Sequence, residues 1–247
     1  MISDKNSGQL LLNFGVKTHM DRDDFMVSDC NKEAFNAIDS WPDWFANGLF
    51  IYGPHGCGKT HLAHLFIDKL RSSTRRPYPV SIIEAQSISM KNIERIANEN
   101  LSVVIENLSV GFDEEALFHL FNIYNQEGRY ILWTGLQNPH QLTVLLPDLK
   151  SRLSMLPCIE VQKPDDVMLQ MLIVKLFNDR QLLITPEILN YIVVNAERSF
   201  SYLQKLVEII DEQSMLYKCA VNYNIVRRAM EIMASQKECE LDLFVNG

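Results

Sequence analysis

Long apolar runs are missing from this chain of 247 residues. No hydrophobic stretch reaches the roughly 18 residues that a membrane-spanning helix needs, so no membrane partner is expected. The N-terminus also lacks the basic segment and apolar run of a secretory signal peptide. We therefore expect a cytoplasmic protein.

An excess of positive charge and a cysteine framework are lacking too. Lys and Arg number 23 against 31 Asp and Glu, which gives a formal net charge of −8. Because binding to nucleic-acid phosphates needs clustered basic residues, DNA binding by bulk electrostatics is not expected. The five cysteines have no C-x-x-C spacing, which favours reduced thiols over a disulfide framework or a zinc site.

Short apolar segments alternate with helical patterns in the first two thirds of the chain. They lie at 49–52, 80–84, 101–105, 130–134 and 158–161. Such strands predict an α/β fold, a parallel sheet with helices on both faces. After Pro164 the strand pattern stops, and four helices are predicted, at 165–178, 186–195, 199–218 and 222–235.

These patterns divide the chain into four parts. An α/β nucleotide-binding domain is expected at 21–163, and a small all-helical lid domain at 164–236. An N-terminal segment at 1–20, polar over residues 1–8, is expected to be mobile, and a C-terminal tail is expected at 237–247.

A phosphate-binding loop follows the first predicted strand and opens a helix, the context that its motif requires. Residues 53–60 match G-x-x-x-x-G-K-[ST] and comprise Gly53, Pro54, His55, Gly56, Cys57, Gly58, Lys59 and Thr60. The glycines let backbone N–H groups converge on phosphate oxygens, Lys59 would reach the β and γ phosphates, and Thr60 would ligate Mg²⁺. The alternative is a structural glycine turn.

Polar residues at the end of the third strand provide the metal side of this site. P-loop ATPases place one acid there for Mg²⁺ and usually a second acid for the attacking water. Glu106 stands at the first position and Asn107 at the second. In a shifted register, Glu106 would orient the water and Ile105 would replace the metal acid. An amide cannot take a proton, so we expect nucleotide binding with weak or no intrinsic ATPase activity.

The arrangement resembles the AAA+ domain of the bacterial replication initiator DnaA, and more closely the Hda group of DnaA-related regulators, over about residues 9 to 235. The segment 146–153, Leu-Pro-Asp-Leu-Lys-Ser-Arg-Leu, looks like the L-P-D-L-x-S-R-L stretch of that group. Residues 131–135 resemble its sensor 1 strand, and 105–107 resemble its I-D-N segment, where DnaA has two acids. The resemblance implies a P-loop AAA+ fold that holds ADP or ATP.

The resemblance also assigns a role to Arg152, that of an arginine finger acting in trans on the γ-phosphate of a neighbouring subunit. A guanidinium there stabilises the charge of the transition state. From the residues alone, a surface arginine at a helix end is the alternative.

Two departures from the family weaken γ-phosphate sensing. Leu136 stands at the polar position of sensor 1, with Gln137 or Asn138 as substitutes. Ser201 falls near the sensor 2 arginine position, with Arg198 one helical turn earlier.

Three apolar residues precede the first helix, where the family packs the adenine base. They are Phe25, Met26 and Val27. Ordinary core packing is the alternative for this segment.

An N-terminal hexapeptide, Gln9-Leu10-Leu11-Leu12-Asn13-Phe14, resembles the Q-L-x-L-x-F motif with which replication proteins bind the sliding clamp, the DNA polymerase III beta subunit. The clamp-binding side chains would be Gln9, Leu10, Leu12 and Phe14. An N-terminal edge strand is the alternative. Residues 240–244 resemble the shorter motif Q-L-D-L-F, with Glu in place of Gln, and could form a second contact or simply end a helix.

The resemblance thus implies a negative regulator of replication initiation, which binds the clamp and stimulates ATP hydrolysis by DnaA. It would be nucleoid-associated through the clamp and would meet DNA only indirectly, because too few residues follow the last predicted helix for the DNA-reading domain of DnaA. The alternatives are an AAA+ ATPase or loader with its own turnover and a non-catalytic clamp-bound adaptor. Homo-oligomer formation is left open.

Overall fold

A five-stranded parallel sheet forms the centre of the first part of the molecule. The computed structural model describes residues 25–73 and 78–245, with side chains described up to residue 236. The strands are β1 (Gly48–Tyr52), β2 (Val80–Glu84), β3 (Ser102–Leu108), β4 (Tyr130–Gly135) and β5 (Cys158–Glu160). Their order is β2-β3-β4-β1-β5, and every pairing is parallel. The predicted α/β fold is confirmed.

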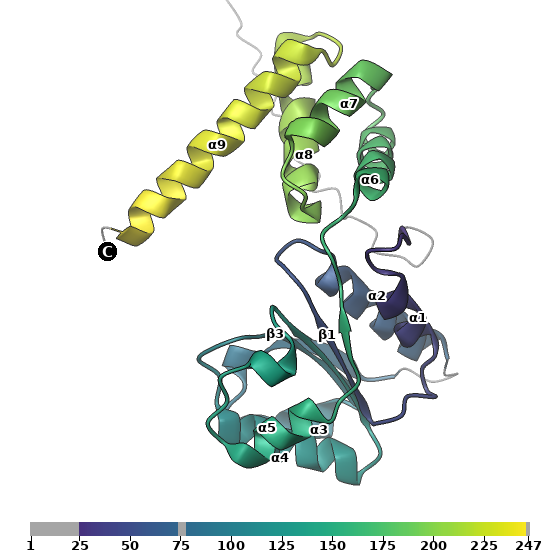
Figure 1. The fold of residues 1–247 in the computed structure, drawn as a ribbon, viewed down its shortest axis with the longest axis vertical. Helices are drawn as coiled ribbons and strands as arrows, with labels where there is room; N and C mark the ends of the chain where they lie inside the picture. The colour runs from purple at the N-terminus through teal and green to yellow at the C-terminus, as the bar shows by residue number, and fades with distance from the viewer. Residues whose placement is uncertain (1–24, 74–77, 246–247) are drawn as a thin grey trace, which may run out of the picture.

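Helices cover both faces of this sheet (Figure 1). One face carries α1 (Lys32–Asp39) and α2 (Lys59–Ser72), and the other carries α3 (Ile93–Glu99), α4 (Glu114–Gln126) and α5 (Pro147–Ser154). Successive residues of a strand point to opposite faces, so Leu49 and Ile51 of β1 pack with α2 while Phe50 packs with α4 and α5. This two-sided burial explains why the strands are apolar throughout.

Four helices follow the sheet, as predicted from the sequence beyond Pro164. They are α6 (Asp166–Asp179), α7 (Pro186–Asn195), α8 (Phe200–Tyr217) and α9 (Tyr223–Val245). The side chains of Asp165, Thr185 and Ser199 cap α6, α7 and α8 by accepting a backbone N–H of the first turn. These helices share a separate hydrophobic core, and we call them the lid helices.

The last helix extends away from the rest of the molecule in Figure 1. It runs through the segment that the sequence suggested as a C-terminal tail, since α9 ends only at Val245. The helix therefore includes residues 240–244, in agreement with the helix-end alternative for that stretch. The boundaries proposed for the four parts of the chain stay a prediction. Among the described residues, no helix is long and apolar enough to cross a membrane.

Candidate phosphate-binding site

The loop between β1 and α2 has the backbone geometry of a phosphate cradle. Gly56 and Gly58 have φ angles of +70° and +102°, in the left-handed region that glycine adopts readily. A Cβ on Gly56 would lie 2.1 Å from Ser199 Oγ, whereas one on Gly58 would meet nothing within 4 Å. Gly56 is thus fixed by contact with the lid helices, and Gly58 leaves open space at the start of α2. Such successive turns expose backbone N–H groups to an anion.

Lys59 is turned back onto the loop that precedes it. Its side chain is 8% exposed, and its Nζ donates to the carbonyl oxygens of Gly53 at 2.7 Å and Pro54 at 2.8 Å. The ammonium is therefore held at the loop, where the motif requires a positive charge for phosphate. Burial raises the pKa of the adjacent Cys57 thiol, although the nearby Lys59 charge opposes this effect. Cys57 is thus a protonated thiol and a poor nucleophile at neutral pH.

Thr60 and Glu106, the two residues expected on the metal side of the site, form a side-chain hydrogen bond. Glu106 lies on β3, its side chain is 6% exposed, and its Oε1 has no hydrogen-bond partner among the described residues. Burial raises the pKa of the Glu106 carboxyl most strongly, a hydrogen bond from Thr60 lowers it, and the charge of Glu84 raises it. An orphaned buried oxygen beside a hydroxyl fits a hard cation held partly by phosphate, the usual arrangement for Mg²⁺. Within the described part of the chain, no group of three or more His, Cys, Asp or Glu side chains could hold a metal ion. A cation here would therefore need phosphate oxygens as further ligands.

Asn107 is anchored on two sides at the end of β3. Its backbone N–H donates to Thr134 Oγ1 at 3.3 Å, and its φ of +58° accompanies a register shift between β3 and β4. Its side-chain amide donates to both carboxylate oxygens of Glu84, at 3.0 and 2.9 Å. Sequence reasoning missed Glu84, which ends β2 and is paired with Glu106 in the parallel ladder. An acidic residue at the end of a second strand is the pattern that could have revealed it.

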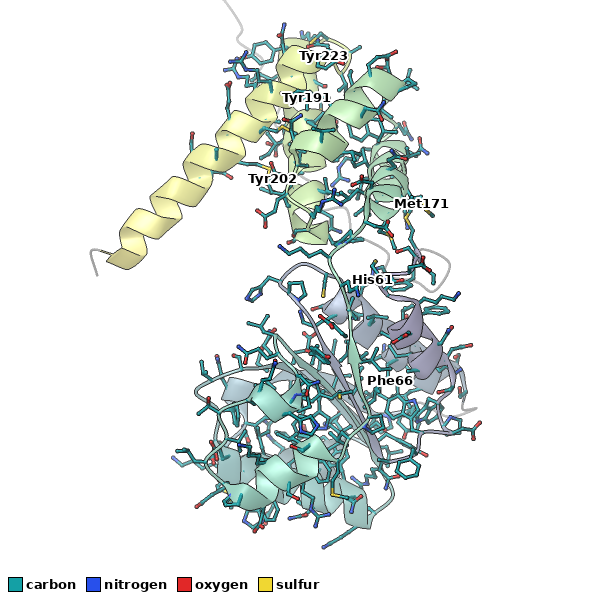
Figure 2. All side chains as sticks on the ribbon, in the orientation of Figure 1. His61, Phe66, Met171, Tyr191, Tyr202 and Tyr223 are labelled. Atoms are coloured by element: carbon teal, nitrogen blue, oxygen red, sulfur yellow. The ribbon has the colours of Figure 1, made fainter. Side chains whose placement is uncertain are left out.

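An aromatic cluster joins the first helices to the lid helices. Phe25 stacks on Phe35 at 5.6 Å between ring centroids and meets the edge of His61 at 5.0 Å. His61 in turn lies 6.0 Å from Phe200, the first residue of α8. Figure 2 shows His61 at the junction between the α/β part and the lid helices. Met26 packs on the lid core, and Val27 is exposed. Whether this segment receives adenine stays a prediction.

Lid and sheet residues considered as sensors are engaged in local contacts. Arg198 donates to the Pro164 carbonyl and forms an ion pair with Asp166, so its guanidinium is held at the start of α6. Ser201 Oγ lies 2.9 Å from Ser199 Oγ, next to Gly56. Near β4, Asn138 caps a 3-10 turn, and Leu136 and Gln137 are not fully buried. On β4 itself, the Thr134 hydroxyl accepts the hydrogen bond from the Asn107 backbone N–H.

Arg152 lies on α5, and its guanidinium is at the protein surface. Its Cζ lies 6.0 Å from the centroid of the Phe121 ring, and among the described residues it forms no ion pair. Helix α5 packs on the sheet face opposite α2 through Leu149 and Leu153. The chain before α5 is fixed by α4, because the Glu114 carboxylate accepts the N–H groups of Leu145 and Leu146 at 3.0 and 2.6 Å.

The proposed clamp-binding residues lie outside the described part of the chain. This holds for Gln9, Leu10, Leu12 and Phe14.

A family model for the bacterial DnaA ATPase domain matches residues 16–110, which include the phosphate-binding loop and both polar strand ends. Over these residues the chain is similar to the ATPase domain of bacterial DnaA. It is 26% identical over 237 residues to the chromosomal replication initiator DnaA of Thermoanaerobacter sp. strain X514, covering 89% of this chain and 53% of that protein. It is also 24% identical to an uncharacterized protein of Haemophilus influenzae, covering 74% of this chain and 81% of that protein.

Solved structures of DnaA share the fold of this chain. Domain III of the Thermotoga maritima initiator superposes with a TM-score of 0.76 at 20% identity, over 85% of this chain and 94% of that one. AMPPCP-bound DnaA from Aquifex aeolicus superposes with a TM-score of 0.63 at 18% identity, over 76% and 63% of the two chains. The chain spans about half the length of the curated DnaA proteins that it matches.

Proposed function

We propose that this DnaA-related protein binds ADP or ATP with Mg²⁺ at the loop between β1 and α2. The open backbone at Gly58, the Lys59 ammonium and the paired Thr60 and Glu106 side chains support this assignment. A relative with the same fold is an AMPPCP complex. Bound Mg²⁺ would supply electrostatic stabilisation of phosphate charge. The loop backbone and the Lys59 ammonium would hold the phosphates.

The proposed function is negative regulation of replication initiation, in which the protein stimulates hydrolysis of ATP bound to DnaA. The observation that carries it is the exposed Arg152, without an ion pair among the described residues, on the sheet face opposite α2. From that face the guanidinium is available to the nucleotide of a neighbouring subunit. A planar guanidinium binds phosphate oxygens through two hydrogen bonds and stabilises the charge that develops on the γ-phosphoryl group.

Docking on the DNA-loaded sliding clamp is the second part of the proposal. Residues 9–14 would bind the clamp, so that the protein meets DNA indirectly and is concentrated near the initiator. A peptide of this length gives modest affinity, which suits a regulator that must leave the clamp again.

The test measures phosphate release from ATP-loaded DnaA in the presence of clamp, DNA and this protein. Arg152→Ala should bind nucleotide and clamp normally, yet lose stimulation by roughly a thousandfold. Lys150→Ala is the matched control, because Lys150 is an exposed cation on the same helix. Full stimulation by Arg152→Ala would show that the finger assignment is wrong. Clamp binding without stimulation by the wild-type protein would instead favour the non-catalytic adaptor.

A further inference from the structure

Position 107 lacks the acidic side chain that P-loop ATPases usually place there, but the neighbouring strand β2 carries one, Glu84. Asn107 itself carries no charge, but its amide donates to both oxygens of the Glu84 carboxylate, at 3.0 and 2.9 Å. The β2–β3 register pairs Glu84 with Glu106, and the two acids form the last pair of that ladder. Since parallel strands place their carboxyl ends at one edge of the sheet, Glu84 shares that edge with the phosphate-binding loop.

The amide that holds Glu84 is itself rigidly placed. Its backbone is fixed by the hydrogen bond to Thr134 and by the positive φ that ends the regular β3–β4 ladder. Two hydrogen bonds from one NH₂ group to one carboxylate restrict both position and orientation of that carboxylate. Glu84 is nevertheless exposed, so water can reach it.

A second observation marks this edge as a ligand site. The Glu106 side chain is 6% exposed and has an oxygen without a partner among the described residues, beside the Thr60 hydroxyl at the start of α2. Glu106 is thus next to both Glu84, its partner in the strand ladder, and the Thr60 hydroxyl.

We propose that Glu84 orients the attacking water for a slow hydrolysis of this chain's own bound ATP, with Asn107 as its positioning residue. The inference rests on the nucleotide binding proposed above, but not on Arg152. In the step, the water oxygen bonds to the γ-phosphorus, the bond from that phosphorus to the β–γ bridging oxygen breaks, and its electron pair stays on ADP. The water protons leave on the released phosphate, while Glu84 accepts a hydrogen bond from the water throughout.

Single-turnover hydrolysis by the full chain tests this role, with Mg²⁺, γ-labelled ATP and neither DnaA nor clamp. The wild-type protein should release phosphate faster than a Lys59→Ala blank. Glu84→Gln keeps an acceptor for the Asn107 amide but removes the charge, and should slow release at least about tenfold. The matched control is Glu94→Gln, which removes one exposed carboxylate from α3. Restoring an acid in Glu84→Gln/Asn107→Asp should recover the rate.

Nucleotide affinity gives a readout that does not depend on turnover. Removing a negative charge beside the γ-phosphate position should tighten ATP binding by about threefold and leave ADP binding unchanged. Equal rates for Glu84→Gln and the wild-type protein, an unchanged preference for ATP over ADP, or no wild-type release above the blank would each overturn the proposal. If hydrolysis is absent while DnaA is still stimulated through Arg152, only this inference fails. If hydrolysis depends on Glu84 and DnaA is not stimulated, only the regulatory function fails.

Discussion

Gly56→Ala is the substitution that best tests how the phosphate-binding loop meets the lid helices. The new methyl group would sit 2.1 Å from Ser199 Oγ and 2.9 Å from Ser199 Cβ, at a backbone φ of +70°. The left-handed conformation alone costs a non-glycine residue about 1–2 kcal/mol. The collision must also be relieved by moving α8, whose Phe200 N–H donates to the Gly56 carbonyl at 2.8 Å. Losing that hydrogen bond adds about 1 kcal/mol.

Gly58→Ala separates the two contributions. Its φ of +102° imposes backbone strain, but a Cβ there meets nothing within 4 Å. Urea unfolding should therefore show Gly56→Ala to be destabilised by about 2–3 kcal/mol and Gly58→Ala by about 1–2 kcal/mol. Adding Ser199→Ala should partly rescue Gly56→Ala, with a coupling free energy of about 0.5–3 kcal/mol. Equal losses for both glycines, with no coupling to Ser199, would refute the proposed contact between the loop and the lid helices.

Two further predictions concern the titrating groups at the site. Burial raises the folded-state pKa of Glu106 above its unfolded value, so this group's contribution to stability is present at low pH and is lost as pH rises through the folded pKa. Glu106→Gln should flatten that decline in pH-dependent urea unfolding and weaken Mg²⁺-dependent ATP binding; an unchanged pH profile would contradict the burial argument. Because burial also raises the pKa of Cys57, iodoacetamide should alkylate it far more slowly at pH 8 than the exposed Cys219. Mass spectrometry of the peptides that contain Cys57 and Cys219 measures the two alkylation rates, and equal rates would be inconsistent with a buried Cys57 thiol.

The sheet and the phosphate-binding loop could be predicted because their signals are local. A strand buried on both faces is apolar along its whole length, as in residues 49–52 and 103–105, and the loop motif is continuous in sequence. Thr60 and Glu106 could be placed on the same side of the site because Thr60 closes the loop motif and Glu106 follows the apolar run of β3.

The contacts that complete the site could not be predicted, since they join distant parts of the chain. Glu84 and Asn107 are 23 residues apart and meet only because β2 and β3 are neighbours in this register. The packing of Ser199 on Gly56 depends on where the lid helices fold back. The sequence suggested Arg198 as a sensor, but it could not show that Asp166 holds the guanidinium. The roles in clamp and initiator binding stay predictions.

The anchoring of the chain before α5 has a practical consequence for genetic screens. One carboxylate, that of Glu114, satisfies two consecutive backbone N–H groups ahead of the helix that carries Arg152. Removing that side chain leaves both N–H groups without their acceptor and frees the helix to change its angle. If Arg152 acts as proposed, a survey of loss-of-function alleles would recover Glu114 beside Arg152, although Glu114 has no direct part in the proposed phosphate contact. An assay with purified components at saturating partner concentration would distinguish a Glu114 variant, in which α5 is misplaced, from an Arg152 variant, in which the guanidinium is missing.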